Sequence, residues 1–246
     1  MKNKIFIITI MLALSATVCS GQSFLSKYPK LTKKSLSEFF SDWEAYSDSI
    51  ASRAVKNDSL IDMVVAYNYL PMQLEGTTYR SGKDASPKYH VVPQYIEVER
   101  YYLDVDTTVF SPRYGFPYYY SELPDNEYRI DSIIPQLPYR GLYLTPDISE
   151  VLSTFVSGWI KGDKMEKIDK GNLKALKKYI PLDGHGHWSG GNWCFESFPL
   201  ITKICYANNL IAVKINTAWF CGKEIWYIKD NGKFVRREEP AGKWIG

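Results

Sequence analysis

Towards its C-terminus, the chain places hydrophobic residues at every second position and interrupts them with short polar turns. A period of two is typical of β-strands that bury one face, whereas a helix repeats about every 3.6 residues. In the longest run, at 210–220, Ile211, Val213 and Ile215 share one face and Lys214 lies on the other. One buried face and one polar face predict an antiparallel sheet.

We predict five strands in this region and three short turns between the last four of them. Asn-Gly is the strongest short hairpin signal, because both residues accept a left-handed backbone. The strands are expected at 193–198, 200–206, 210–220, 223–229 and 233–238. The turns are expected at Asn208-Asn209, Cys221-Gly222 and Asn231-Gly232.

The turn at Asn208-Asn209 also predicts which residues face each other across its hairpin. Because the turn sets the register, the numbers of paired residues should sum to about 417. Cys205 should therefore face Ala212, and an extension of the same register brings Cys221 near Cys194. If a disulfide forms, we expect Cys194–Cys221. Otherwise these three cysteines are expected to be small buried thiols, as free cysteines often are.

Four segments carry apolar residues at the spacing of an amphipathic helix, and we predict helices at 35–54, 58–70, 147–160 and 172–180. Ser35 and Glu38 form a capping-box pattern at the start of the helix at 35–54. Asp58 can cap the helix at 58–70, which must end before Pro71 because proline cannot continue a helix. The third has the clearest apolar stripe: Ile148, Val151, Leu152, Phe155, Val156 and Trp159.

Between these helices, strands are predicted at 94–104, 128–134 and 139–144, with a loop at 72–90 and an irregular stretch at 105–127. Helices and strands in separate parts of the chain are typical of an α+β fold. We expect helices packed on a curved antiparallel sheet in the C-terminal half, and N-terminal helices with a few strands. The expected regions are 22–145 and 146–246, which can equally form one domain.

The first residues have the layout of a secretory signal peptide. Two lysines precede an apolar run at 5–16 that is too short to remain as a membrane span. We expect cleavage of residues 1–21, after Gly21, and soluble export to the periplasm or the extracellular space. The second choice is a lipoprotein anchored through Cys19. Val18 disfavours the anchor, because that position is normally a smaller residue.

Charge narrows the class of partner. The formal net charge of +3 falls to +1 without the two leader lysines. A nearly neutral chain has no bulk attraction for nucleic acid, and no other segment is long and apolar enough to cross a membrane. The expected partner is an envelope protein or a small ligand.

A glycine-rich stretch at 184–192 is predicted to be a loop, and the best candidates for ligand binding lie in it or, in the case of Glu196, shortly after it. Glycines let a ligand approach the backbone closely. The candidate ligand-binding residues supply hydrogen-bond donors, acceptors and an aromatic ring: His185, His187, Trp188 and Glu196.

The same region allows a catalytic interpretation, as a metal-dependent or Cys/His hydrolase. The residue types that such chemistry requires are Asp183, His185, His187, Cys194 and Glu196. Against it, a glycine-rich loop would hold metal ligands poorly, and the chain lacks the common nucleotide, hydrolase and metalloprotease motifs. We therefore expect a non-catalytic binding protein with no cofactor and no metal, His185 and His187 being the candidate ligands if a metal is bound. No catalytic residue is assigned.

Tyrosine provides a third interpretation. The chain has 19 tyrosines, many of them between Tyr101 and Tyr143. Exposed rings can stack on sugars, which would make the protein a surface glycan-binding protein. Tyrosine is also a favoured strand residue, which explains the same excess without a ligand.

The second half contains Tyr179-Ile180-Pro181, His185-Gly186-His187-Trp188, Gly190-Gly191, Glu196-Ser197-Phe198-Pro199 and a terminal Lys243-Trp244-Ile245. In this order the motifs resemble a group of uncharacterised exported proteins of gut-dwelling Gram-negative bacteria. The first half, around Trp43 and 95–102, also resembles that group. In the second half, this chain departs from the group at Cys221-Gly222, where those proteins usually have a double-glycine turn. The resemblance implies an envelope or extracellular location and no particular activity. The C-terminal half also resembles the cone-shaped fold of nuclear transport factor 2, which includes both enzymes and non-catalytic binders.

Overall fold

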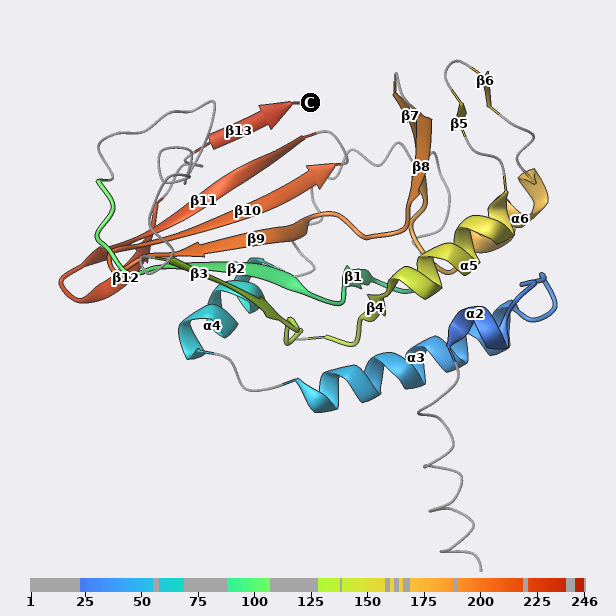
Figure 1. The fold of residues 1–246 in the computed structure, drawn as a ribbon, viewed down its shortest axis with the longest axis horizontal. Helices are drawn as coiled ribbons and strands as arrows, with labels where there is room; N and C mark the ends of the chain where they lie inside the picture. The colour runs from blue at the N-terminus through green and yellow to red at the C-terminus, as the bar shows by residue number, and fades with distance from the viewer. Residues whose placement is uncertain are drawn as a thin grey trace, which may run out of the picture.

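The structure is a computed structural model. It describes residues 23–54, 58–68, 88–106, 128–137, 139–157, 160–161, 164–165, 169–187, 190–218, 221–237 and 242–245. The expected leader, the lipid-anchor candidate Cys19, the stretch 107–127 and Trp188 lie outside these residues. The described part confirms the α+β class, with helices concentrated in the N-terminal half and most strands in the C-terminal third (Figure 1).

The helices expected from the sequence are present, with one short addition. They are α2 (Phe24–Lys27), α3 (Leu36–Arg53), α4 (Ser59–Asn68), α5 (Pro146–Val156) and α6 (Lys170–Leu176). Asp58 accepts a hydrogen bond from the Leu60 N–H at 2.9 Å, as expected of a cap. The capping box at Ser35 was a wrong prediction, because its hydroxyl bonds with Thr32 instead. Helix α5 ends before the predicted residue 160, because Ser157 adopts a left-handed φ of 48°.

One seven-stranded sheet dominates the fold. Its strand order is β12-β11-β10-β9-β2-β3, and β13 also pairs with β11. The strands are β2 (Ile96–Tyr101), β3 (Tyr128–Ile133), β9 (Leu200–Tyr206), β10 (Leu210–Ala218), β11 (Cys221–Asp230), β12 (Lys233–Arg236) and β13 (Gly242–Ile245). All pairs are antiparallel except β2–β9, which is parallel. The part of the chain before α5 thus supplies two strands of the sheet, β2 and β3.

Two of the three predicted turns agree with the structure. Ala212 faces Cys205, as the register at Asn208-Asn209 predicts, before the pairing shifts between Lys214 and Ile215. Asn231-Gly232 is a hairpin turn with both φ angles positive. The Cys221-Gly222 turn is wrong, because both residues belong to strand β11.

The cysteines do not follow the disulfide expectation. The backbone of Cys221 pairs with Ala218 and Ile245 in the large sheet. Cys194 lies in a different sheet, and its thiol donates a hydrogen bond to Glu196. The expected Cys194–Cys221 bridge is therefore not formed, because the two residues belong to different sheets and the register of the Asn208-Asn209 hairpin does not extend to Cys194. The buried Cys205 is a free thiol, in line with the alternative expectation.

Three pairs of short strands complete the structure: β1 (Val91–Pro93) with β4 (Leu142–Leu144), β5 (Ile160–Lys161) with β6 (Lys164–Met165), and β7 (Asp183–His187) with β8 (Gly190–Cys194). The stretch expected as a loop at 184–192 is therefore a β-hairpin. The strand predicted at 193–198 is wrong beyond Cys194, because the residues from Phe195 to Pro199 belong to no strand.

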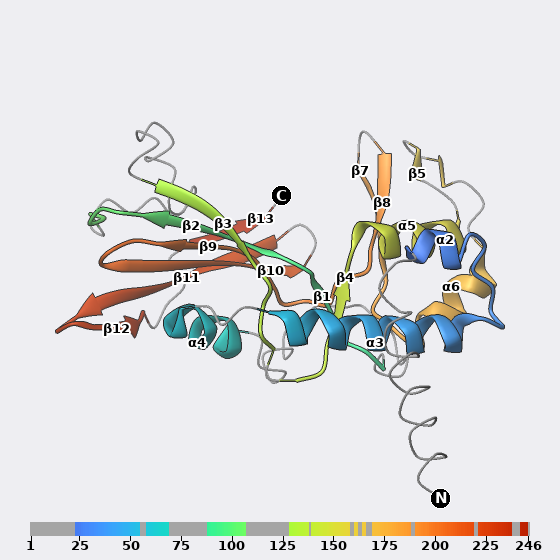
Figure 2. The same cartoon turned by 60° about the horizontal axis from the view of Figure 1, so that its bottom comes forward.

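Helix α3 joins two of the three apolar clusters of the described residues. The sheet core lies between α4, the end of α3 and one face of the large sheet, and it includes Ile50, Ile61, Val64, Val65, Ile96, Val98, Ile204, Ile211, Val213 and Ile225. The helical core joins α3, α5 and α6, and it includes Leu36, Phe39, Phe40, Trp43, Ile148, Leu152, Phe155, Leu176 and Phe195. Helix α5 was expected on the sheet, but its buried residues belong to the helical core. Helix α3 contributes to both cores (Figure 2).

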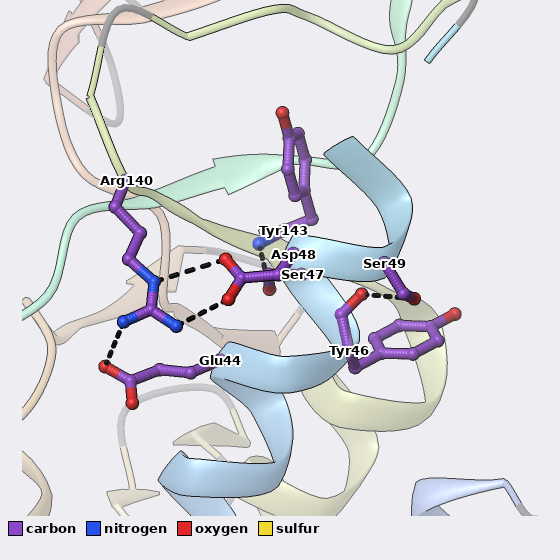
Figure 3. Close-up of polar contacts among 7 residues, drawn as sticks. All are labelled: Glu44, Tyr46, Ser47, Asp48, Ser49, Arg140 and Tyr143. Atoms are coloured by element: carbon purple, nitrogen blue, oxygen red, sulfur yellow. Dashed lines mark hydrogen bonds and ion pairs between the residues drawn. The ribbon is translucent and has the colours of Figure 1, made fainter. Parts of the chain in front are cut away.

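Helix α3 also completes the hydrogen bonding of β4 (Figure 3). The N–H of Tyr143 donates to the Ser47 hydroxyl at 3.0 Å, and its carbonyl accepts from the Trp43 indole at 2.8 Å. These groups lie on the edge of β4 that does not pair with β1. Nearby, the Arg140 guanidinium binds both carboxylate oxygens of Asp48, at 3.2 and 2.6 Å. The strand edge is thereby satisfied by a helix instead of another strand.

Candidate functional site

The β7–β8 hairpin stands away from the large sheet, beside β5 (Figure 1). Both of its ends are fixed by a single segment at 88–91. Before the hairpin, the Tyr179 carbonyl accepts from the Tyr89 N–H at 2.8 Å. After it, Ser197 and Val91 exchange two hydrogen bonds, of 2.8 and 2.9 Å. The hairpin therefore projects from a base that is held on both sides.

Buried residues strengthen this base. Ile180 and Leu182 precede the hairpin and Phe195 follows it, and all three belong to the helical core. Trp193, on the second strand, is half-buried and packs against the same core. A rigid base under a projecting element is a common arrangement for binding groups.

The register separates the hairpin residues into two sets. Asp183 faces Cys194, His185 faces Asn192, and His187 faces Gly190. Directly opposed residues share a face, and alternate residues of a strand share a face. One face therefore has the positions of all the polar residues of the two strands: Asp183, His185, His187, Asn192 and Cys194. The other face has the positions of Gly184, Gly186, Gly191 and Trp193.

Two side chains at the hairpin base are described in detail. The Cys194 thiol donates to the Glu196 carboxylate, with 3.3 Å between Sγ and Oε2, and both residues are half-buried. Of the expected site residues, Glu196 thus lies beside the polar face of the hairpin. His185 and His187 occupy alternate positions in β7, and Trp188 lies outside the described residues. Among the side chains that the structure describes, no three His, Cys, Asp or Glu form a metal-binding group.

A second polar cluster, on the large sheet, was missed by the sequence interpretation. It lies on the face opposite α4, and we call it the outer-face cluster: Glu97, Glu99, Tyr101, Lys203 and Cys205. The Lys203 ammonium contacts the carboxylates of Glu99 and Glu97, the latter at 2.9 Å. Tyr101 donates to Glu99 at 2.7 Å, and the Cys205 thiol donates to it at 3.4 Å.

The directions of the pKa shifts indicate that the charge of Glu99 is balanced by its neighbours within this cluster. Burial alone would raise the pKa of Glu99, but the hydrogen bonds from Lys203 and Tyr101 outweigh it and lower that pKa. Burial and the charge of Glu99 raise the pKa of Cys205 well above its ordinary value. The Cys205 thiol therefore stays protonated and is a poor nucleophile.

The sequence did contain a signal for this cluster. Glu97 and Glu99 alternate with the buried Ile96 and Val98, which favours a solvated polar face. Only the parallel β2–β9 pairing reveals that Lys203 faces Glu97 and that Cys205 faces Glu99. Such pairing between residues about 106 positions apart has no local signature.

The tyrosine-rich region is only partly described. Tyr101 and Tyr143 are buried and hydrogen-bonded, so these two rings serve the fold. Tyr95 and Tyr102, at the two ends of β2, are exposed at 53% and 56%. Tyr102 belongs to the tyrosine-rich region and Tyr95 lies just before it, while the stretch 107–127 lies outside the described residues.

The chain was compared with protein families, curated proteins and solved structures. No family model, curated protein or solved structure matches it. Within the described residues, no helix has the length and apolar character needed to span a membrane.

Proposed function

We propose that the chain is an exported, non-catalytic binding protein of the cell envelope, and that the β7–β8 hairpin is its binding element. The observation that carries this proposal is the hairpin register, which assigns the polar positions of both strands to a single face. The hairpin base is hydrogen-bonded on both sides and packed into the helical core. A projecting, anchored element with one polar face fits recognition of a partner or ligand.

Export is supported by the leader pattern and by the resemblance to exported bacterial proteins. The proposed location is the periplasm or the extracellular space, with a lipid anchor at Cys19 as the second choice. A binding role requires only the polar face.

A pull-down from envelope extract tests the binding element. The bait is the untagged chain coupled to a resin, compared with the double variant His185→Ala/His187→Ala. The control is Lys229→Ala/Lys233→Ala, which removes two exposed polar side chains near the tip of another hairpin. We expect the control to retain the captured component and the histidine variant to lose it.

The stability of both variants is measured alongside. Substitutions at exposed sites usually change the free energy of unfolding by no more than about 0.5 kcal/mol, and we expect this of the lysine control. If the two histidines serve binding, their replacement should change the free energy of unfolding as little. Undiminished capture by the histidine variant would show that the hairpin is not the binding element. A large loss of stability with retained capture would assign the two histidines to the fold.

A further inference from the structure

Strand β3 forms one edge of the large sheet (Figure 2). One side of its backbone pairs with β2, and among the described residues no strand pairs with the other side. An unpaired strand edge presents N–H and C=O groups with which another strand can pair. Side chains along this edge are open to such a strand, because Arg129, Ile130 and Ser132 are exposed, Ile130 at 53%.

The sequence of β3 is complementary to itself when two copies run antiparallel. If Ile130 of one chain lies opposite Ile130 of a second copy, Arg129 of each chain faces Asp131 of the other. Directly opposed residues of an antiparallel pair contact each other, and opposite charges at such positions attract. Two exposed isoleucines would therefore meet between two ion pairs. This reciprocal pattern is the one that a two-fold dimer requires.

The charged side chains of β3 retain capacity for hydrogen bonds to a second copy. Within one chain, the Arg129 guanidinium donates to Asp131 from Nε and Nη2, at 3.0 and 2.7 Å, and Arg100 donates to it at 3.2 Å. All three bonds end on Oδ2 of Asp131. A carboxylate accepts at both oxygens and a guanidinium has five N–H donors. Beyond these described bonds, Asp131 Oδ1 and Arg129 Nη1 are therefore left for the opposed residues of the second copy.

The strand at the other edge of the sheet, β12, is not complementary to itself. Val235 on β12 is as exposed as Ile130, at 53%. Self-pairing about Val235 would place Lys233 opposite Arg237. A shift by one residue would instead place Lys233 opposite Arg236. Like charges that oppose each other destabilise a strand pair, so the charges favour a second copy at β3 and disfavour one at β12.

We propose that the protein forms a two-fold dimer in which β3 pairs antiparallel with β3 of a second copy, centred on Ile130. The pairing occupies the free strand edge, covers the exposed isoleucine of each chain and adds two Arg129–Asp131 ion pairs between the chains. Because opposed residues share a face, the two large sheets form one continuous sheet with α4 of both chains on the same face. The contact involves no residue of the β7–β8 hairpin and does not depend on the binding role proposed for it.

Sedimentation equilibrium over a range of chain concentrations measures the dimer, and far-ultraviolet circular dichroism checks that each variant is folded. We expect a concentration-dependent dimer of the wild type. Ile130→Lys opposes two ammonium groups at the centre of the pairing and should weaken dimerisation by at least about 10-fold. Val235→Lys makes the same change at an equally exposed site on the other edge and should leave dimerisation unchanged. A wild type that is monomeric at every concentration, or equal behaviour of the two variants, would overturn the proposal.

Cysteine cross-linking tests the register. Position 130 of one chain lies opposite position 130 of the other, within the limit of about 7 Å between Cα atoms for a disulfide. The two copies of position 132 lie about 13 Å apart along the strands, beyond that limit. Under mild oxidation we expect a covalent dimer of Ile130→Cys, but not of Ser132→Cys or of the wild type, which controls for the native cysteines. No more covalent dimer from Ile130→Cys than from Ser132→Cys would rule out this pairing.

Discussion

Glu99 is a carboxylate that the fold holds in its charged form. Only 7% of the residue is exposed, and burying an unpaired charge is strongly unfavourable. Lys203, Tyr101 and Cys205 each direct a donor at this carboxylate. These three donors, which come from strands β2 and β9, offset the cost of burying the charge.

This arrangement predicts a dependence of stability on pH. The pKa of Glu99 in the folded protein lies below its ordinary value of 4.5. A lowered folded pKa contributes stability that is complete above the unfolded pKa and is lost as the pH falls through the folded pKa. The wild type should therefore lose stability below pH 4.5 in part through Glu99.

The measurement is urea unfolding of the wild type and Glu99→Gln between about pH 7 and pH 3. We expect the wild type to be more stable at neutral pH and the difference to shrink in acid. A difference that stays constant over this range would show that the ionised form of Glu99 adds no stability. Glu97→Gln, which changes an exposed partner of the same lysine, is the matched control.

At the scale of elements, the α3–β4 contact supplies hydrogen-bond partners for the backbone groups on the free edge of a short two-stranded sheet. The Tyr143 N–H and carbonyl are bound by Ser47 and Trp43 of α3. Without the serine, a buried N–H loses its acceptor, which costs about 1–3 kcal/mol. Helix α3 is therefore a hydrogen-bonding partner of the strand as well as an apolar surface.

Ser47→Ala should lower the free energy of unfolding by about 1–3 kcal/mol. Ser52→Ala, on the same helix, is the control, because Ser52 is exposed and bonds only to its own helix. It should change the free energy by less than about 0.5 kcal/mol. Chemical denaturation of both variants measures the difference, and equal effects would mean that the Tyr143 N–H finds another acceptor.

Elements with strong local signals were predictable from the sequence. The stripes of α3 and α5 and the register at Asn208-Asn209 depend on residues close together in the chain. The β7–β8 hairpin was mistaken for a loop because glycine is unfavourable in strands, and only pairing between two glycine-rich segments makes them regular. Residue type alone suggested His185 and Glu196, but not which histidine lies near Cys194.

At the scale of the whole molecule, the two cores share one helix. Phe39 of α3 is buried in the helical core, and Ile50 of the same helix is buried in the sheet core. Loss of either core therefore removes the support of α3 from the other. The described part of the chain should unfold in one cooperative transition, because residues on both sides of the expected boundary at 145/146 also contribute to each core.

Phe39→Ala and Ile50→Ala test this coupling, one in each core. Each should lower the free energy of unfolding by about 2–5 kcal/mol. Far-ultraviolet and near-ultraviolet circular dichroism should report the same midpoint in both variants. Two separate transitions, each shifted by only one of the variants, would show that the cores unfold independently.

The parallel pairing of β2 with β9 has a consequence for the order in which the molecule acquires its structure. Strand β2 ends at Tyr101, and β9 begins at Leu200, so its neighbour is synthesised only after about a hundred further residues. Until then, one edge of β2 and the apolar surface of α4 have no sheet to cover them. Contacts so distant in sequence slow folding, because a long loop must close before they form. The nascent chain must therefore remain incomplete, with an open strand edge, until its last third has emerged.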